Sequence, residues 1–255
     1  MVPVICALFG LMIGSFLNAL IYRLPREINI VFPRSACTHC KKKIYWYENI
    51  PILSFVILRG KCSHCGKKIS WRYPIVETIT AIVSVLLAPH GLEIQYLLPY
   101  VFYFSVFCCF LAHFLIDWEH QILPDGINIY LALLFIAYVV MDKPWTHWAI
   151  GGSIGILLPL LVTWIFYLWR GLVGLGGGDI KLYGALGLYL GPMGIISNIF
   201  LSCLVGSFFG LSLLGLKRMK KSDPIPFGPF IIIVASWQIF FPDSFSRVMS
   251  WLTEY

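Results

Sequence analysis

The chain has 255 residues, of which 59% are hydrophobic and 12% charged, and its formal net charge is +7. Soluble domains run at about 45–50% apolar and about 25% charged residues, so this composition excludes a soluble domain, a disordered chain and a secreted disulfide scaffold. A mean hydropathy of +0.82 indicates a membrane protein. At about 20 apolar residues per spanning helix, the length allows up to roughly eight crossings and one modest polar segment.

Apolar stretches follow one another along most of the chain. The first covers residues 3–22 and has no small-residue cleavage site after a short apolar core, so we expect a retained anchor and not a signal peptide. The others cover residues 75–88, 94–116, 126–141, 147–169, 181–191, 194–216 and 225–241. The stretches at 75–88 and 181–191 are short for a full span and could be tilted or re-entrant. The pattern predicts an all-α polytopic membrane protein with about eight transmembrane helices.

A basic segment separates the first apolar stretch from the others. Residues 23–72 hold 11 of the 19 Lys and Arg residues, and Glu27 and Glu48 are the acids there. Loop charge of this kind marks the cytoplasmic side of a membrane. We therefore expect a first transmembrane helix at 1–22, a small cytoplasmic module at 23–74 and a transmembrane domain at 75–255. The expected partner of the basic charge is the lipid bilayer, and nucleic acid is not expected.

The other basic residues give one orientation of the chain. Threading eight spans with the 23–74 segment inside leaves both termini outside. It also places the membrane-flanking residues on the inner side: Arg170, Lys181 and the cluster Lys217, Arg218, Lys220 and Lys221. Omitting one mid-chain crossing would move the 217–221 cluster to the wrong side, so the charges support the count of eight.

Four of the eight cysteines form two Cys-x-x-Cys pairs in the basic segment, at Cys37, Cys40, Cys62 and Cys65. Two such knuckles supply the four thiolates of a tetrahedral Zn²⁺ site, and the neighbouring lysines offset its negative charge. Gly66 stands where a knuckle needs a positive backbone angle. Disulfides or a redox dithiol are alternatives, although the cytoplasmic side argues against stable disulfides. We predict a structural zinc ion, and expect the other four cysteines to be small apolar side chains.

Four acids stand out in the apolar part of the chain: Asp117, Glu119, Asp125 and Asp179. An ionisable residue at the end of a spanning helix is a functional hypothesis. In the expected orientation, Asp117 and Asp179 both lie at cytoplasmic ends of spans, where two carboxylates could share a proton and activate water. Other interpretations remain open: Asp125 and Asp179 could cap the helices that follow them, and Asp117 could pair with Arg170.

Several motifs occur in one order along residues 10–231. They are Gly14-Ser15-Phe16-Leu17-Asn18, the two cysteine pairs, Glu48-Asn49-Ile50-Pro51, Arg72-Tyr73-Pro74 with Glu77, Ile116-Asp117, Leu123-Pro124-Asp125, Gly176-Gly177-Gly178-Asp179-Ile180-Lys181 and Pro226-Phe227-Gly228-Pro229-Phe230. Each motif is modest by itself. In this order they closely resemble the bacterial prepilin peptidases of type IV pilus and type II secretion systems.

The resemblance implies a bifunctional enzyme of the bacterial inner membrane, with periplasmic termini and a cytoplasmic 23–74 segment. It would cleave the leader of type IV prepilins and pseudopilins after a glycine at the cytoplasmic face, then methylate the new terminal residue with S-adenosylmethionine. The family's catalytic aspartates match Asp117 and Asp179, and its zinc ligands match Cys37, Cys40, Cys62 and Cys65.

Methyl transfer is associated in that family with the segment that corresponds to residues 23–77. No glycine-rich nucleotide fingerprint is present, so the pattern does not locate the cofactor. Glu48 and Glu77 are the acids nearest the cysteine module, and either could hold the amine or the cofactor ribose. For Glu77, however, we expect the role of a carboxylate at a helix N-terminus.

Three other functions remain open at this point. One is an intramembrane aspartyl protease without methyltransferase activity. Another is an ion-coupled transporter with a zinc regulatory module. Inverted repeats would favour a transporter, but the sequence shows no such repeat. The third is an inactive assembly factor.

Overall fold

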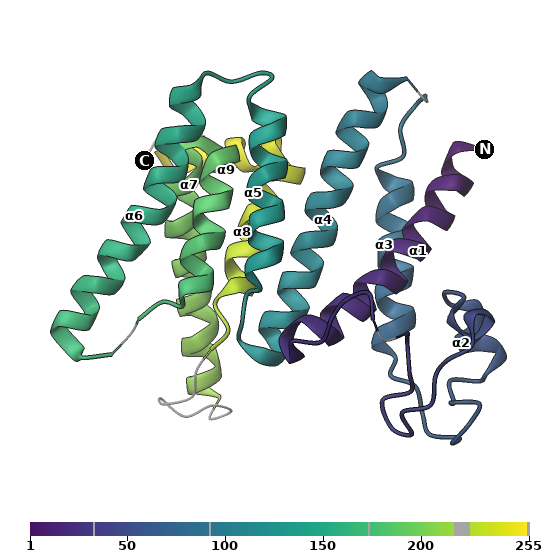
Figure 1. Ribbon diagram of the computed structural model, residues 1–255. Coiled ribbons are helices and arrows are strands. Elements are labelled where there is room, and N and C mark those ends of the chain that lie inside the picture. The colour runs from purple at the N-terminus through teal and green to yellow at the C-terminus, as the bar shows by residue number, and fades with distance from the viewer. Residues whose placement is uncertain (33, 92, 173, 217–224, 254–255) are drawn as a thin grey trace. The chain divides into compact units, whose positions relative to one another are not determined.

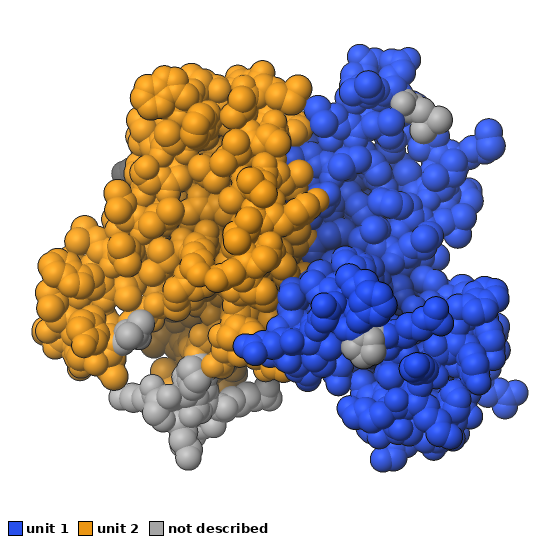
Figure 2. All heavy atoms as spheres, in the orientation of Figure 1, with its two compact units in different colours: residues 1–108 blue, residues 109–255 orange. Residues whose placement is uncertain are grey.

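The computed structural model describes residues 1–255 except 33, 92, 173, 217–224 and 254–255, and the described residues form helices without a named strand (Figure 1). The prediction of an all-α protein is confirmed. The chain forms two compact units, residues 1–108 and residues 109–255 (Figure 2). Helix α4, Ile94–His120, begins in the first unit and ends in the second. The three-part division expected at residues 22 and 74 stays a prediction.

Unit 1 is built on two closely packed helices. They are α1 (Val2–Arg23) and α3 (Arg72–Leu86), with the short helices η1 (Leu24–Arg26), η2 (Trp46–Asn49) and α2 (Leu53–Ile57) between them in the chain. Gly10 and Gly14 allow the close approach, because a Cβ on Gly10 would lie 2.7 Å from the Cα of Ala81 and one on Gly14 would lie 2.7 Å from the Cα of Glu77. This Gly-x-x-x-Gly pair therefore brings α1 against the face of α3 that carries Glu77.

Unit 2 is centred on α7 (Gly177–Gly215). This helix packs against α5 (Asp125–Val139), α6 (Trp145–Arg170) and α8 (Gly228–Phe240), and α9 (Pro242–Thr253) follows α8 (Figure 1). Glycines again set the closest contact, since a Cβ on Gly151 of α6 would lie 2.7 Å from the Cα of Gly191.

Helix α7 reverses direction near its middle. Gly191 has φ 71° and ψ −176°, which are not helical values, and Pro192 follows it. The hydroxyls of Tyr183 and Ser202 are 2.6 Å apart, whereas nineteen residues of straight helix would separate them by about 28 Å. The element therefore consists of two antiparallel arms, 177–190 and 192–215, which correspond to the two apolar stretches expected at 181–191 and 194–216.

Several helices are long and apolar enough to cross a membrane. Within the described part of the chain there are 4, namely Val2–Arg26, α4, α6 and α7, or 5 if the α8–α9 pair, bent by 104°, counts as one span. Helices α3 and α5 have 15 residues each. The structure thus supports an integral membrane protein, while the count of eight spans is not confirmed. The basic cluster at 217–221 lies outside the described residues, so the orientation also stays a prediction.

Candidate active site and metal centre

Asp117 is held in the last turn of α4 by the start of α8. Its side chain is buried, and its Oδ2 accepts the backbone N–H of Gly228 at 2.9 Å. A Cβ on Gly228 would lie 2.8 Å from the same oxygen, so only glycine allows this approach. The sequence motif at 226–230 thus has a structural role that sequence reasoning did not assign.

Asp179 lies in the first turn of α7 and is partly exposed. Its Oδ2 accepts the backbone N–H of Gly176 at 3.2 Å, at the N-terminal end of the helix. The interpretation of Asp179 as a helix-capping residue is therefore confirmed. Capping occupies Oδ2 and leaves the other carboxylate oxygen, Oδ1, without a protein donor among the described residues.

The turn before α5 connects the surroundings of the two aspartates. A Cβ on Gly178 would lie 2.9 Å from the Cβ of Leu123, and a Cβ on Gly228 would lie 3.1 Å from the Cδ2 of Leu123. The carboxyl groups of Asp117 and Asp179 are close enough to interact electrostatically. Unit 2 therefore brings together the two acids that the sequence singled out, in an arrangement in which carboxyl groups can share one proton.

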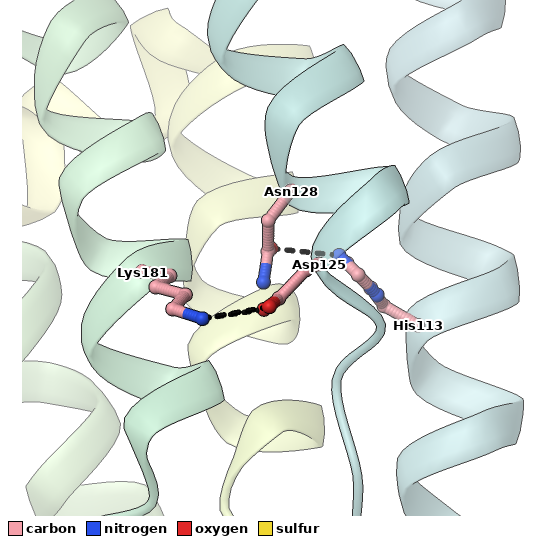
Figure 3. Close-up of polar contacts among 4 residues, drawn as sticks. All are labelled: His113, Asp125, Asn128 and Lys181. Atoms are coloured by element: carbon pink, nitrogen blue, oxygen red, sulfur yellow. Dashed lines mark hydrogen bonds and ion pairs between the residues drawn. The ribbon is translucent and has the colours of Figure 1, made fainter. Parts of the chain in front are cut away.

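Asp125 does not cap its helix, contrary to the expectation. Helix α5 begins at Asp125 itself, its N-cap is Pro124, and no side chain makes the cap bond. Its carboxylate oxygens Oδ1 and Oδ2 instead accept hydrogen bonds from Lys181 Nζ, at 2.7 and 2.8 Å (Figure 3). Because Lys181 lies two residues after Asp179, this ion pair connects the start of α5 to the turn that carries Asp179.

The suggested pair between Asp117 and Arg170 is absent from the described ion pairs. Arg170 instead lies over the ring of its neighbour Trp169, with 4.8 Å from its guanidinium carbon to the ring centroid. Asp117 is bonded to the backbone of Gly228. That alternative interpretation is therefore wrong.

A buried polar pair lies one helical turn before Asp117. The Nε2 of His113 on α4 and the Oδ1 of Asn128 on α5 are 2.9 Å apart, and both side chains are buried (Figure 3). The contact connects α4 to α5. Sequence analysis did not single out this pair, although a histidine four residues before Asp117 in an apolar run was a detectable signal.

The four paired cysteines come together in unit 1. The sulfur atoms of Cys37, Cys40, Cys62 and Cys65 lie within 4.8 Å of one another, and none forms a disulfide. The Sγ atoms of Cys37 and Cys65 are 3.9 Å apart. A tetrahedral zinc site with Zn–S bonds of about 2.3 Å has sulfurs about 3.8 Å apart, so the donor set and its spacing fit Zn²⁺.

The two knuckles share one backbone design. The N–H of Cys37 donates to the carbonyl of Lys42, and the N–H of Cys62 donates to that of Lys67, each at 2.9 Å. Partial burial opposes ionisation of Cys37, but backbone N–H groups of Cys40 and His39 donate to its sulfur and lower its pKa to about 7. The cysteine module therefore favours the thiolate form that a metal requires.

The remaining cysteines lie apart from this cluster. Cys6, Cys108 and Cys109 are buried, Cys203 is exposed on α7, and all four are free thiols. They are apolar helix residues, as expected.

Unit 1 also contains a cavity of about 690 Å³ lined by residues of α1, α3 and the cysteine module, including Asn18, Glu48 and Glu77. Glu48 accepts the backbone N–H of Tyr45 at 3.1 Å at the start of η2. Glu77 is not in the first turn of α3, so the expected helix-terminal role is wrong. Its Oε2 instead accepts the N–H of Ile52 at 2.8 Å.

Comparison with known proteins gives matches over nearly the whole chain. Residues 8–90 match the bacterial peptidase A24 N-terminal domain, and residues 103–211 match the type IV leader peptidase family. Proteins named prepilin leader peptidase/N-methyltransferase are 38% identical in Aeromonas hydrophila, 34% in Pseudomonas aeruginosa and 33% in Legionella pneumophila. The alignments cover 94%, 96% and 98% of this chain and 91%, 92% and 94% of those proteins. No solved structure matches.

Proposed function

We propose, since the chain belongs to the prepilin leader peptidase/N-methyltransferase family, that Asp117 and Asp179 are the pair that cleaves the leader peptide. The protein is thus a prepilin peptidase with N-methyltransferase function, and not a transporter. The observation that supports the assignment to these two residues is their convergence: α4, α7 and α8 place both carboxyl groups in one electrostatically coupled site.

The chemistry follows from two carboxyl groups that share one proton. The ionised aspartate takes a proton from a water molecule as its oxygen attacks the scissile carbonyl carbon. The protonated aspartate polarises the carbonyl oxygen. Proton delivery to the amide nitrogen then allows the C–N bond to break, which leaves a leader carboxylate and a new amine. The two aspartates titrate as a unit, so we assign the roles to the pair.

Glycines beside Asp179 leave room for the substrate backbone. A Cβ on Gly177 would meet no atom within 4 Å, so this position borders open space next to the carboxylate. An extended peptide with a glycine at the scissile bond could approach there more closely than one with a larger side chain. We propose that this is why cleavage follows a glycine.

The test is a mass-spectrometric time course on purified enzyme in detergent, given a prepilin with a Gly-Phe junction and S-adenosylmethionine. The parent should remove the leader and then add one methyl increment. Asp117→Asn and Asp179→Asn should each slow cleavage at least about a hundredfold, the scale of general acid–base catalysis. Asp142→Asn, at an exposed site near Lys143, is the matched control and should cleave normally.

Cleavage that survives either variant at the parental rate would refute the assignment of the pair. Absence of cleavage by the parent enzyme would refute the peptidase function itself. Retained folding of each variant is checked by its helix content, because zinc content would report only on the other unit, where the cysteines lie.

We further propose that Cys37, Cys40, Cys62 and Cys65 hold a structural Zn²⁺ ion. Four thiolates complete the coordination shell, which leaves no open position for substrate or water. The ion would order a segment that has little apolar core of its own, and leader cleavage would proceed without direct zinc chemistry.

Finally, we propose that the chain lies in the bacterial inner membrane with both termini periplasmic and residues 23–74 cytoplasmic. The support is the basic charge of that segment. The proposed substrates are type IV prepilins or pseudopilins. The name of the family supports the prepilins. The basic module would repel a basic leader, so bulk electrostatic attraction would not explain recognition of such a leader.

A further inference from the structure

The cavity is lined by residues of unit 1, whereas the aspartate pair proposed for leader cleavage lies in unit 2. Its volume of about 690 Å³ is in the range of small-molecule sites, about 300–1,000 Å³. Its walls carry both signs of charge, with positive charge in excess: the acids are Glu48 and Glu77, and the cations are Arg23, Arg26, Arg34, Lys41, Lys67, Lys68 and Arg72. A site of this kind fits a ligand that itself carries separated positive and negative groups.

Glu77 is a buried carboxylate without a cationic partner. Its residue is 6% exposed, and its donors are the backbone N–H of Ile52, at 2.8 Å, and the hydroxyl of Ser15 on α1. No cation pairs with it among the described residues. Burial of a carboxylate is costly when only neutral groups compensate it, so a positive charge at this wall of the cavity would stabilise ionised Glu77.

The backbone at Ile52 is held in an unfavourable conformation to make this contact. Ile52 has φ 59° and ψ −50°, a region that β-branched residues rarely adopt. Strain of this kind persists only where the surroundings impose it, and it clusters at ligand sites. Here the strained residue directs its N–H at Glu77.

Asn18 lines the same cavity and carries an unpaired acceptor. The residue is 1% exposed, and its Nδ2 donates to the carbonyl of Tyr73 at 3.0 Å. Its Oδ1 is buried and has no hydrogen-bond partner among the described atoms. Buried polar atoms are almost always paired, so an unpaired acceptor on a residue that lines the cavity indicates a donor on the ligand.

We propose that this cavity is the methyl-transfer pocket and that Glu77 binds the new N-terminal ammonium group of the cleaved pilin, with Asn18 Oδ1 accepting a second N–H. The inference rests on the proposed function, which generates that amine. A terminal ammonium group supplies both the positive charge that Glu77 lacks and the donor that Asn18 lacks.

An ammonium group cannot accept a methyl group until it loses a proton. Glu77 takes that proton and leaves a neutral amine held between its carboxyl group and Asn18. S-adenosylmethionine, when bound, supplies a methyl group that bonds to the amine nitrogen while the electrons of the broken C–S bond return to sulfur. Arg34 lines the cavity, has no ion-pair partner among the described residues, and would hold the carboxylate of this cofactor.

The test measures binding without the cofactor. Full-length enzyme in detergent is titrated, by fluorescence anisotropy at pH 6.5, with a labelled peptide of a mature pilin that begins with phenylalanine. A second peptide has the same sequence with an acetylated N-terminus. The parent should bind the free amine at least tenfold more tightly. In Glu77→Gln the two affinities should be equal, with the acetylated peptide bound as in the parent.

Glu27→Gln is the matched control, because it removes an exposed glutamate of unit 1 that does not line the cavity. It should keep the tenfold preference. Glu77→Gln should also cleave the leader at the parental rate while methylation of a precleaved pilin falls at least tenfold.

A preference for the free amine that survives in Glu77→Gln, or that is absent in the parent, would overturn the proposal. If lost cleavage shows that Glu77→Gln does not fold, Glu77→Asp is tested in its place. Aspartate keeps the charge but is one methylene shorter, so the preference for the free amine should weaken. An unchanged preference would overturn the proposal. A parent that neither cleaves nor methylates would instead refute the proposed function.

Discussion

Lys41 and Gly66 occupy equivalent positions in the two cysteine knuckles, one residue after Cys40 and Cys65. Their φ angles are 59° and 68°. The left-handed conformation costs a residue with a Cβ roughly 1–2 kcal/mol, and glycine does not incur this cost. The first knuckle therefore carries strain that the second avoids.

We predict opposite effects of exchanging these residues. Gly66→Ala should destabilise the module by about 1 kcal/mol, and Lys41→Gly should stabilise it by at most about that amount, because glycine also loosens the unfolded chain. A Cβ at Gly66 meets no atom within 4 Å, so the effect reports φ alone. The half-time of zinc transfer from the protein to a chelator measures the change in stability of the module. Equal effects of the two substitutions would contradict the strain argument.

Gly228 tests the geometry around Asp117. Its replacement by alanine would place a methyl group 2.8 Å from Asp117 Oδ2, which must then move off the N–H that it accepts. A displacement of about 1 Å in a catalytic group costs about a hundredfold in rate. We therefore predict that Gly228→Ala slows leader cleavage about a hundredfold and leaves methylation of a precleaved pilin normal. Gly126→Ala, at an open site in α5, is the control, and an equal loss there would contradict the prediction.

At the scale of elements, the ion pair between Lys181 and Asp125 connects α5 to α7. Both side chains are more than half exposed, so the pair contributes at most about 1 kcal/mol to stability. Its effect should appear in the position of Asp179, two residues before Lys181. Lys181→Met should therefore lower the cleavage rate several-fold with little change in Tm.

A double-mutant cycle checks this assignment. Asp125→Asn should give a similar loss, and the double variant should be no slower than either single variant, because both substitutions break the same contact. If the losses multiply, the two residues act independently and the pair does not position Asp179.

The sequence predicted the elements well where a long apolar run or a fixed spacing carried the signal. The apolar stretches became helices, and the reversal of α7 at Gly191 had been expected as two stretches. The two Cys-x-x-Cys pairs predicted one cluster, since a knuckle fixes its own local geometry. Helix starts were less predictable: Asp125 looked like a cap, but its pairing with Lys181, 56 residues away, decided its role.

The parts of the site that were missed depend on contacts distant in sequence. Gly228 donates to Asp117 across 111 residues, and Ile52 donates to Glu77 across 25. Neither residue has a side chain that signals hydrogen bonding, because the donor is the backbone. Only tertiary packing places such groups, so composition and spacing contain no trace of them.

At the scale of the whole molecule, the residues proposed for cleavage and for methyl transfer lie in different compact units. Asp117 and Asp179 belong to residues 109–255, whereas the cavity with Glu77 belongs to residues 1–108. The cysteine module forms part of the cavity wall, through residues that include Cys37 and Cys62. Removal of zinc should therefore disorder the wall of the cavity and leave the aspartate pair in place.

We predict that a chelator separates the two activities. Zinc-depleted enzyme should lose at least tenfold in methylation of a precleaved pilin and stay within twofold of the parent in leader cleavage, with methylation restored by added Zn²⁺. The reason is that a module with little apolar core depends on its metal for folding, whereas α4, α7 and α8 pack through apolar faces and glycines. A proportional loss of both activities, in protein whose helix content is unchanged, would mean that zinc also supports the cleavage site.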